Sequence, residues 1–451
     1  MILSESLAAV RDITVPPYTR LRERIDPGWV EALLAGDREV RVRRRKLPAS
    51  SVVWVVVAAA LYSHLNFAEM VKRLGLTATT ARGNEQAPPS SGSVAEARAR
   101  LGDEAMQRVF RALARSWVAE PDVSAGRYNG LQVLAADGTT FLAPDTQRNR
   151  DGLGLPPTAE GRARAAFPQA RLLALMDVYS HIVIDAVLGR YDDDERSMLG
   201  QIAGAIPANS LLLLDRGFRS WRLLLGIHRR GEERHWLLRG HDALVAETIE
   251  QLGPGDRLVY VFHGYQARRA DERLPRRMRC REITYSVGGR AYRLLTSLLD
   301  SERFPAAELA RMYRARWEIE LAFDDIKDEQ RASADVLRSK TPEGVRQEIW
   351  GILTAHNLVR VEMARAAALV GVMPYRISFH GSLQLVASQI QVVAEVTAPT
   401  KIASRQWLLR HEIAALVLPE RRSQRHYPRA VKRVVSRYPK KRDPPPAGPA
   451  G

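Results

Sequence analysis

The chain has 451 residues, of which 45% are hydrophobic and 26% are charged, so it can bury a substantial core and should form more than one domain. Its 68 Lys and Arg residues exceed its 51 Asp and Glu residues, and the net charge of +17 favours a polyanion such as nucleic acid as partner. The single cysteine, Cys280, excludes an intrachain disulfide and a cysteine-based zinc site, and it fits a reducing cytoplasm.

The sequence carries no signal for export or membrane insertion. Its first residues, MILSESLAAVRDI, lack a basic segment followed by a long apolar run. The most apolar run, residues 52–62, is shorter than the ~20 residues that a membrane span requires. We therefore expect a cytoplasmic protein without a membrane partner.

The N-terminal region, residues 1–118, is expected to be mostly helical. Residues 52–65 predict a buried helix, and residues 67–74 predict a shorter one. The shorter helix could be part of a DNA-reading helix-turn-helix or an ordinary amphipathic helix. After a Pro/Ser/Gly connector at residues 86–93, a longer helix should begin with a capping box near Ser93.

Short apolar runs then predict the strands of an α/β core, with helices between them. The strands are expected at residues 131–137, 171–180, 181–189, 210–215 and 235–240, and the helices from Asp192 and over 220–230. Residues 241–299 are expected to form a β-rich insertion, because VGGR at 287–290 is a hairpin signal between apolar runs. After Pro305 the chain should be helical to about residue 370.

Two basic segments are candidate DNA contacts. The first precedes the N-terminal helices, and the second is a tail at residues 421–442 that holds no acidic residue. The first could instead be a solvated charged strand, and the second could simply raise solubility. We expect both to bind DNA phosphates. The residues assigned to this role are Arg43, Arg44, Arg45, Lys46, Lys432, Arg433, Lys440 and Lys441.

Two aspartates are placed where α/β proteins carry reactive groups. Asp137 is expected to end one strand before Gly138, and Asp215 is expected to end another before Arg216 and Gly217. Ligands of α/β sheets bind beyond the strand ends, where a glycine lets the backbone turn. Aspartates are also common there as turn and helix-capping residues, so the pair alone does not establish a site.

A helix predicted over residues 306–330 gathers polar groups on one face. Tyr313, Arg316, Glu320 and Lys327 stand at offsets 0, 3, 7 and 14, which places them within roughly 60° of each other on an α-helix. An apolar stripe beside them can anchor the helix on a core while Glu320 faces Asp137 and Asp215. The alternative is a solvated face on which Arg316 and Glu320 simply pair.

Three carboxylates without Cys or His favour Mg²⁺, or Mn²⁺ in its place, because these hard cations take oxygen ligands. Two such ions about 4 Å apart would activate an attacking oxygen and stabilise the leaving one at phosphorus. The predicted chemistry is phosphoryl transfer, with Asp137, Asp215 and Glu320 as catalytic residues and metal ligands.

The helix resembles the Y-(2)-R-(3)-E-(6)-K signature of bacterial insertion-sequence transposases of the IS4 family, as YRARWEIELAFDDIK at residues 313–327. DGTTFLAPDTQRN from Asp137 and LLLLDRGFRSW from Leu211 are similar to the two aspartate motifs of that family, and the resemblance covers roughly residues 40–440. It implies an RNase H-like core split by a β-rich insertion, with two metal ions on the three carboxylates. It also implies that Tyr313, Arg316 and Lys327 contact DNA near the cut end, and we add Arg216 to this set.

The expected organisation is therefore a helical DNA-binding domain at residues 1–118, an RNase H-like catalytic domain at 119–370 and a helical, basic C-terminal region at 371–451. The expected function is cut-and-paste DNA transposition on double-stranded terminal inverted repeats and target DNA. Because two transposon ends must be joined, we expect a homodimer or a larger synaptic complex on DNA. We expect the protein to be associated with the nucleoid in the cytoplasm of a prokaryotic cell. The alternatives are an RNase H-like nuclease without strand transfer and a non-catalytic DNA-binding relic.

In related elements, a tryptophan of the insertion stacks on a base that is extruded when the transposon end forms a hairpin. No tryptophan lies between Gly240 and Asp300 here, so this step either is absent or uses another aromatic ring. The nearby aromatic residues are Trp236, Tyr260, Phe262, Tyr265, Tyr285 and Tyr292.

Five further acids are left out of the catalytic set, although they could in principle join the metal site. Asp177 and Asp185 are expected at outward-facing strand positions, and Asp192, Asp193 and Glu195 at a helix start.

Overall fold

The computed structural model describes residues 27–34, 49–73, 78–79, 86–123, 126–156, 167–241, 245–262, 274–330, 336–395 and 399–419. Both basic segments assigned to DNA binding, at 41–46 and 421–442, lie outside these ranges, as does Tyr265, so their roles stay predictions. Across the ranges that are described, no helix is long and apolar enough to span a membrane.

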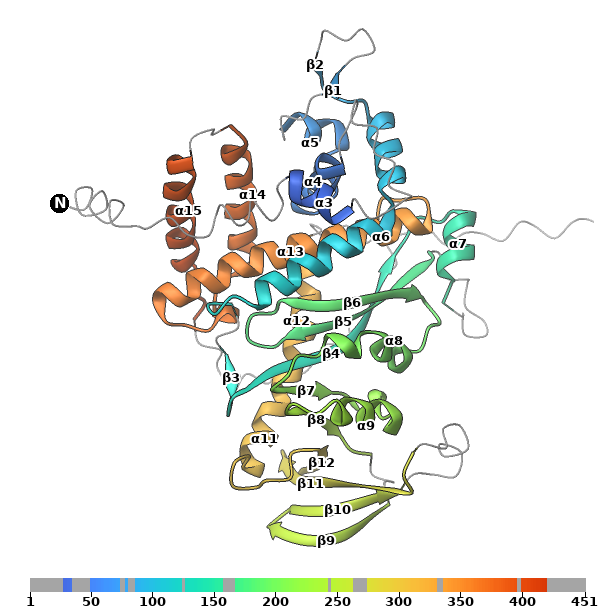
Figure 1. The fold of residues 1–451 in the computed structure, drawn as a ribbon, viewed down its shortest axis with the longest axis vertical. Coiled ribbons are helices and arrows are strands. Elements are labelled where there is room, and N and C mark those ends of the chain that lie inside the picture. The colour runs from blue at the N-terminus through green and yellow to red at the C-terminus, as the bar shows by residue number, and fades with distance from the viewer. Residues whose placement is uncertain are drawn as a thin grey trace, which may run out of the picture.

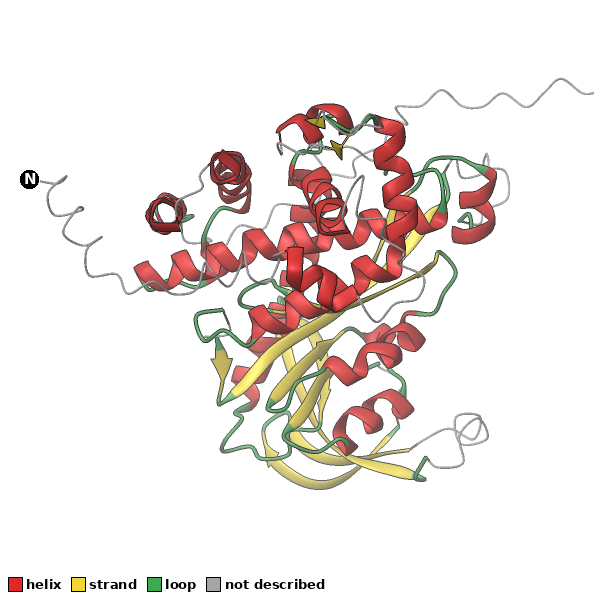
Figure 2. Cartoon of the chain, turned by 45° about the horizontal axis from the view of Figure 1, so that its top comes forward, coloured by secondary structure: helices red, strands yellow, loops and turns green. Residues whose placement is uncertain are grey.

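One mixed sheet runs through the molecule (Figure 1). Its strands follow the order β6-β5-β4-β7-β8-β12-β11-β10-β9, and the short β3 pairs with β4. The bounds are β3 Arg127–Tyr128, β4 Leu131–Leu142, β5 Gln169–Asp177, β6 Val183–Arg190, β7 Ser210–Leu214, β8 Arg234–Arg239, β9 Ala246–Gly253, β10 Asp256–Phe262, β11 Arg277–Val287 and β12 Arg290–Thr296. Figure 2 shows these strands as one continuous curved layer.

The first half of the sheet has the topology that the resemblance implies. Strands β4, β5 and β6 form an antiparallel meander, and β7 and β8 lie parallel to β4 on its other side. Helix α8 (Glu195–Ile202) connects β6 to β7, and α9 (Trp221–Arg229) connects β7 to β8. This order and these directions fit an RNase H-like core.

The strands of the predicted insertion join this same sheet. Strand β12 pairs antiparallel with β8, and β11, β10 and β9 continue outward from it. The hairpin predicted at VGGR is confirmed, with Gly288 and Gly289 at φ of 57° and 77°, which side chains with a Cβ rarely adopt. In space, therefore, the insertion lengthens the sheet rather than forming a separate β unit.

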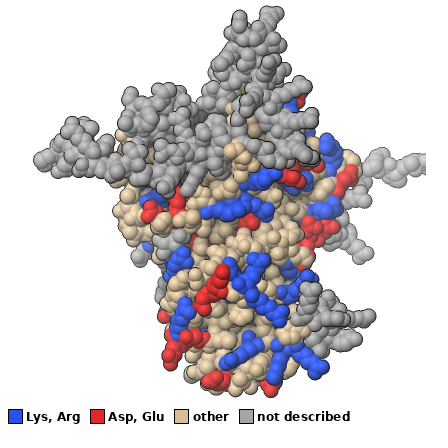
Figure 3. Space-filling model, viewed as in Figure 1, with Lys and Arg blue, Asp and Glu red and all other residues tan. Residues whose placement is uncertain are grey.

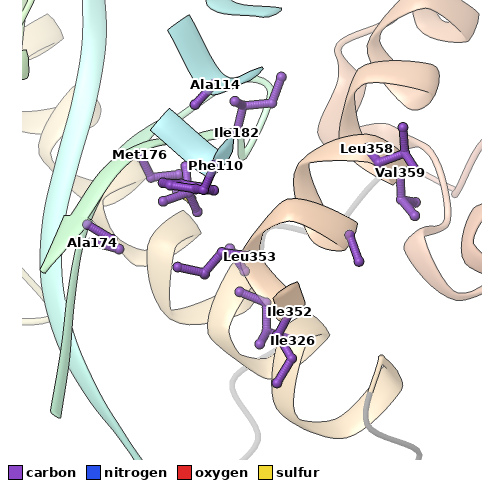
Figure 4. Close-up of a cluster of buried hydrophobic side chains, with 14 of the residues drawn as sticks. Phe110, Ala114, Ala174, Met176, Ile182, Ile326, Ile352, Leu353, Leu358 and Val359 are labelled. Carbon is purple, nitrogen blue, oxygen red and sulfur yellow. The ribbon is translucent and has the colours of Figure 1, made fainter. Parts of the chain in front are cut away.

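Helices cover both faces of the sheet. On one face lie α8 and α9, which are packed against an apolar cluster that includes Leu134, Ala136, Leu212 and Leu214. On the other face lie α6 (Ser91–Val118), α12 (Glu318–Asp324) and α13 (Pro342–Val370). Figure 4 shows how their side chains meet those of β5, with Phe110, Met176, Ile326 and Leu353 in one buried cluster.

Further helices extend this second face at both ends of the chain. They are α3 (Pro27–Leu34), α4 (Ala49–Leu61) and α5 (Phe67–Arg73) from the N-terminal region, and α14 (Phe379–Glu395) and α15 (Pro399–Ala414) from the C-terminal region. One apolar cluster is continuous from Val30 to Ala414, so these helices share the core of the sheet. The division into three domains stays a prediction.

The ends of the two long helices follow from local chemistry. Helix α6 is capped by Ser90, whose hydroxyl accepts a hydrogen bond from Ser93 N at 3.2 Å, so the predicted start near Ser93 is three residues late. Helix α13 begins with Thr341 as its cap and Pro342 in its first turn, and it ends at Gly371 with φ of 66°.

Helices α4 and α13 cross in close contact at Gly351. A Cβ added there would lie 2.8 Å from the backbone oxygen of Val56 and 2.6 Å from its Cγ1. Only glycine lets the two helices approach so closely, and this contact fixes the N-terminal helices on the core.

We expect Gly351→Ala to lower the free energy of unfolding by about 1–3 kcal/mol, because the helices must separate to admit a methyl group. Gly200→Ala is the matched control, since Gly200 is an exposed glycine of α8 with nothing within 4 Å of an added Cβ. The control should be neutral or more stable. Urea denaturation of both variants tests this, and equal stability would contradict the close crossing.

Candidate active site

Asp137 lies inside β4 rather than at its end, so that part of the strand prediction was wrong. The strand continues to Leu142, because residues 138–142 remain paired with β5. On its other side, the parallel pairing with β7 stops at Ala135 opposite Leu213. Asp137 therefore stands just beyond the end of the parallel ladder, at an edge of β4 that no strand of the described residues covers.

Asp215 follows directly after β7, as predicted, and it is the next group along the same edge. Extending the register from Ala135 and Leu213 by two residues places Asp215 beside Asp137. Asp215 caps the short 3-10 helix Arg216–Phe218 and accepts a hydrogen bond from Gly217 N. Arg216 is exposed next to it.

The segment predicted as one α-helix over 306–330 is helical but irregular. Helix α11 (Ala306–Met312) passes into a 3-10 helix (Tyr313–Trp317), then α12, then a π-helix (Asp325–Glu329). A 3-10 helix has three residues per turn, so Tyr313 and Arg316 stand directly above one another. Short 3-10 and π segments inside helices are often found at functional sites.

Three of the four motif side chains contact the strand edge directly, and Glu320 is linked to it through Arg316. Tyr313 Oη donates to Leu214 O at 3.1 Å, and Lys327 Nζ donates to Thr139 Oγ1. Arg316 lies between two carboxylates, with Asp137 Oδ2 at 3.0 Å and Glu320 Oε1 at 2.9 Å.

The pairing of Arg316 with Glu320 is therefore present, but it is not the solvated surface pair of the alternative interpretation. Arg316 is only 8% exposed, and its second partner is Asp137 on the sheet. The guanidinium thus ties the helical segment to β4.

The electrostatic environment of Asp137 disfavours its charged form. Burial raises its pKa from 3.8 to about 6, and the carboxylates of Asp215 and Glu195 add to the rise. Gly138 N and Arg316 act in the opposite direction without cancelling it. Burial also raises the pKa of Tyr313 to about 12, which keeps its phenol neutral as the donor to Leu214 O.

Two polar side chains that the sequence analysis missed contact the helical segment and help to hold it in place. His181 Nε2 lies 2.9 Å from Glu318 Oε2, two residues before Glu320. Arg360 of α13 pairs with Asp325 at the start of the π-helix, close to Lys327. These partners are distant in sequence, so no local pattern could have found them.

Of the five acids left out of the catalytic set, one lies next to the site. Glu195 approaches β4 from the face covered by α8, and its carboxylate fills the space that a Cβ at Gly138 would need. Its partner is Arg171 Nη1 at 2.6 Å. The glycine directly after Asp137 was the one sequence signal for this approach.

Two others were wrongly expected to face outward. Asp177 is 2% exposed and accepts hydrogen bonds from Gln132 and Ser180. Asp185 is also buried and pairs with Arg111 at 2.8 Å. Both positions are covered because helices pack over this part of the sheet. The expected helix start is confirmed, since Asp194 caps α8 and Glu195 is in its first turn.

The donor set suits a hard divalent cation, although the side chains are not gathered around one point. Within the residues that the structure describes, no group of three or more Asp, Glu, His or Cys side chains is close enough to hold a metal ion. Asp137 and Asp215 are adjacent carboxylates, and burial, helped by the charges of Asp215 and Glu195, raises the pKa of Asp137. Arg316 supplies the positive charge between Asp137 and Glu320.

Aromatic residues of the insertion lie on the same face of the sheet as this helical segment. Tyr285 and Tyr292 form a cross-strand stacked pair with ring centroids 5.5 Å apart, and the Arg239 guanidinium lies 5.1 Å from the Tyr292 ring. The charge of Arg314 also acts on Tyr285. Trp236, by contrast, is 1% exposed in the core of the opposite face.

The raised pKa of Asp137 predicts a pH-dependent loss of stability. Because its folded pKa of about 6 exceeds 3.8, ionising Asp137 opposes folding, and the stability present at low pH is lost as pH rises through 6. Relative to Asp137→Asn, the wild type should lose up to about 3 kcal/mol between about pH 4 and pH 7.

Urea denaturation from pH 4 to pH 8 in metal-free buffer measures this difference. Asp122→Asn, which removes an exposed carboxylate, is the control and should follow the wild type. Parallel stability curves for the wild type and Asp137→Asn would show that Asp137 ionises without cost in the folded protein.

Two segments of the chain match known protein families. Residues 17–111 match the family described as "Insertion element 4 transposase N-terminal", and residues 128–358 match "Transposase DDE domain".

Individual transposases are also similar to this chain. "Transposase InsG for insertion sequence element IS4" from Escherichia coli strain K12 is 34% identical over 424 residues, which cover 94% of each chain. "Putative transposase InsZ" from the same strain is 34% identical over 236 residues, 52% of this chain and 76% of the relative. A cryo-EM structure of a piggyBac transposase synaptic complex with hairpin DNA aligns over 88% of this chain and 83% of its own, with 10% identity and a TM-score of 0.41. The family matches and the nearly full-length similarity to InsG show that this chain belongs to the IS4 family of DDE transposases.

Proposed function

We propose that this DNA transposase binds the terminal inverted repeats of its element, cleaves them and joins the 3′ ends to target DNA. The observation that carries the proposal is the convergence of Asp137, Asp215 and the Tyr313–Lys327 helical face at one edge of the sheet. This edge brings together carboxylates, which can bind metal ions, and the cationic side chains of Arg316 and Lys327, which can bind DNA phosphates. A phosphoryl transfer on DNA requires both kinds of group.

Asp137, Asp215 and Glu320 are the proposed ligands of two Mg²⁺ ions, for which Mn²⁺ can substitute. Bound there, the ions would supply activation of the attacking oxygen and charge stabilisation at the leaving oxygen. Three carboxylates and no soft ligand agree with this choice of metal. Transposase DDE domains typically use divalent metal ions, and we propose here that the ions are Mg²⁺ and that two of them bind.

Arg316 is proposed to exchange partners during the reaction. In this structure its guanidinium neutralises Asp137 and Glu320 together. Once the carboxylates are neutralised by cations, the same fork of donors is available to a DNA phosphate, which guanidinium binds in bidentate fashion. Lys327, Tyr313 and Arg216 border the edge and are the other proposed contacts to the cut end.

The proposed organisation follows the sequence expectation. Residues 1–118 would bind DNA, residues 119–370 would form an RNase H-like catalytic domain, and residues 371–451 would add a helical and basic C-terminal region. Joining two ends of one element requires at least two catalytic centres, so we propose a homodimer or a larger synaptic complex on DNA.

Two other functions use the same fold and would be separated by experiment. A nuclease would hydrolyse DNA without joining it, and a DNA-binding relic would do neither. The family membership and the complete Tyr-Arg-Glu-Lys face favour the transposase.

The decisive experiment is Mg²⁺-dependent cleavage and strand transfer on DNA that carries the terminal repeats, with wild type and Glu320→Gln compared. Loss of one metal-ligating charge should lower cleavage by about 1,000-fold or more, because metal stabilisation of the transition state amounts to several kcal/mol. Binding of the ends should persist. Asp328→Asn, which removes an exposed carboxylate of the same helical segment, should cleave like the wild type.

Each alternative has its own result in this assay. Hydrolysis without joining of a pre-cleaved end would leave a nuclease, and binding without cleavage by the wild type would leave a relic. Equal cleavage by wild type and Glu320→Gln would remove Glu320 from the metal site.

If the reaction includes a hairpin at the transposon end, we propose that the Tyr285–Tyr292 pair receives the extruded base, because Trp236 is buried. Base stacking on an aromatic ring contributes ~1–3 kcal/mol, so Tyr292→Leu should reduce hairpin formation by about 10-fold or more without slowing the first nick. Denaturing gels of end-labelled DNA resolve the two steps. Tyr260→Leu is the control, because Tyr260 of β10 is an aromatic residue of the insertion outside the Tyr285–Tyr292 pair, and the Arg277 guanidinium already covers its ring. Unchanged hairpin yield in Tyr292→Leu would exclude the pair.

A further inference from the structure

A strip of arginines begins directly after Asp215 and continues along α9. Residues 216–231 contain no acidic residue. The arginines of this strip are Arg216, Arg219, Arg222, Arg229 and Arg230, and all five are exposed. In the view of Figure 3, Lys and Arg side chains gather over the part of the molecule where Figure 1 draws α9 and the strands below it.

Four of the five arginines of this strip carry positive charge that is not compensated within the described structure. In the residues that the structure covers, Arg216, Arg219, Arg229 and Arg230 form no salt bridge, whereas other exposed arginines, such as Arg148 with Glu343 at 3.7 Å, do. The next acids along the chain are already neutralised. Glu232 pairs with Arg234 at 2.8 Å, and Glu233 pairs with Arg303 at 3.0 Å.

Gly226 is a second, independent observation on the same face of α9. The buried face of this helix consists of Leu223, Leu224, Leu225 and Ile227, and the exposed face presents Arg222, Gly226 and Arg229. A glycine inside a helix lowers its stability by ~1 kcal/mol relative to alanine. Packing does not require it here, because an added Cβ at Gly226 would meet nothing within 4 Å. The absence of a side chain at Gly226, between Arg222 and Arg229, does, however, let a ligand approach the backbone of α9 closely.

We infer that this strip binds the phosphate backbone of duplex DNA next to the cut end. Arg222 and Arg229 are seven residues apart on one face, about 10 Å, which spans about three phosphates of one strand. The strip lies on the α8 and α9 face of the sheet, and Tyr313, Arg316 and Lys327 lie on the other face. DNA at the Asp137–Asp215 edge is therefore held from both sides. This inference rests on the proposed function, because it takes DNA as the substrate of that edge.

The test is the salt dependence of binding to duplex DNA that carries an element end, measured by fluorescence anisotropy. The triple variant Arg219→Gln, Arg229→Gln, Arg230→Gln should lower the slope of log affinity against log salt by about 2–3, since each lost phosphate contact removes about 0.9. The control is Arg100→Gln, Arg148→Gln, Arg277→Gln, which removes the same charge from exposed, ion-paired arginines. Its slope should change much less, and equal slopes for the two triple variants would overturn the inference.

Gly226→Gln provides a readout that separates binding from folding. The variant should melt at an equal or higher temperature than the wild type, because glutamine favours a helix, yet bind the same duplex several-fold more weakly. Unchanged affinity would count against close approach of DNA to α9.

If wild type cleaves the ends but the strip variants bind normally, the inference alone fails. If wild type binds through the strip but never cleaves, the proposed function fails alone.

Discussion

The position of Arg316 between Asp137 and Glu320 organises the site. Asp137 belongs to the sheet, Glu320 to a helix that the chain reaches only after the whole insertion, and the guanidinium joins them. Two carboxylates in a partly buried position repel one another unless a cation is present. Arg316 supplies that cation in the protein alone, so the helical segment can dock on β4 without any bound ligand.

The helical segment that carries Arg316 and Glu320 is also held in place by side chains from other parts of the chain. His181 holds Glu318, and Arg360 holds Asp325, from elements that lie on either side of the helix in sequence. Removing one partner of a buried pair leaves the other without compensation, so both contacts restrict where the helical segment can lie. The π-helix and the 3-10 helix, which cost some hydrogen-bond quality, are retained where they aim Tyr313, Arg316 and Lys327 at the strand edge.

Much of the fold and the candidate site followed from sequence patterns, and the failures have physical reasons. The positions of the strands along the chain and the motif spacing were accessible because apolar runs and helical offsets are local properties, whereas the arrangement of the core was implied by the family resemblance. The continuation of β4 past Asp137 was missed, since Gly138 looks like a strand end although Thr139 to Leu142 pair with β5. An offset of three, as between Tyr313 and Arg316, shares a helix face in α and 3-10 geometry alike, so the irregular turns could not be distinguished. Glu195 was dismissed because its approach to Gly138 depends on how α8 packs on the sheet.

The continuity of the sheet across β8 and β12 has a consequence for how such proteins can diverge. Strand β8 is hydrogen-bonded to β7, which positions Asp215, and to β12, which belongs to the insertion. A shift of one residue in a strand turns every side chain to the opposite face. The insertion therefore cannot be exchanged independently where it joins β8, because its register there is tied to the edge that carries Asp137 and Asp215. Length and shape can vary at the distant strands β9 and β10, where the sheet ends and the pairing of neither β4 nor β7 depends on them.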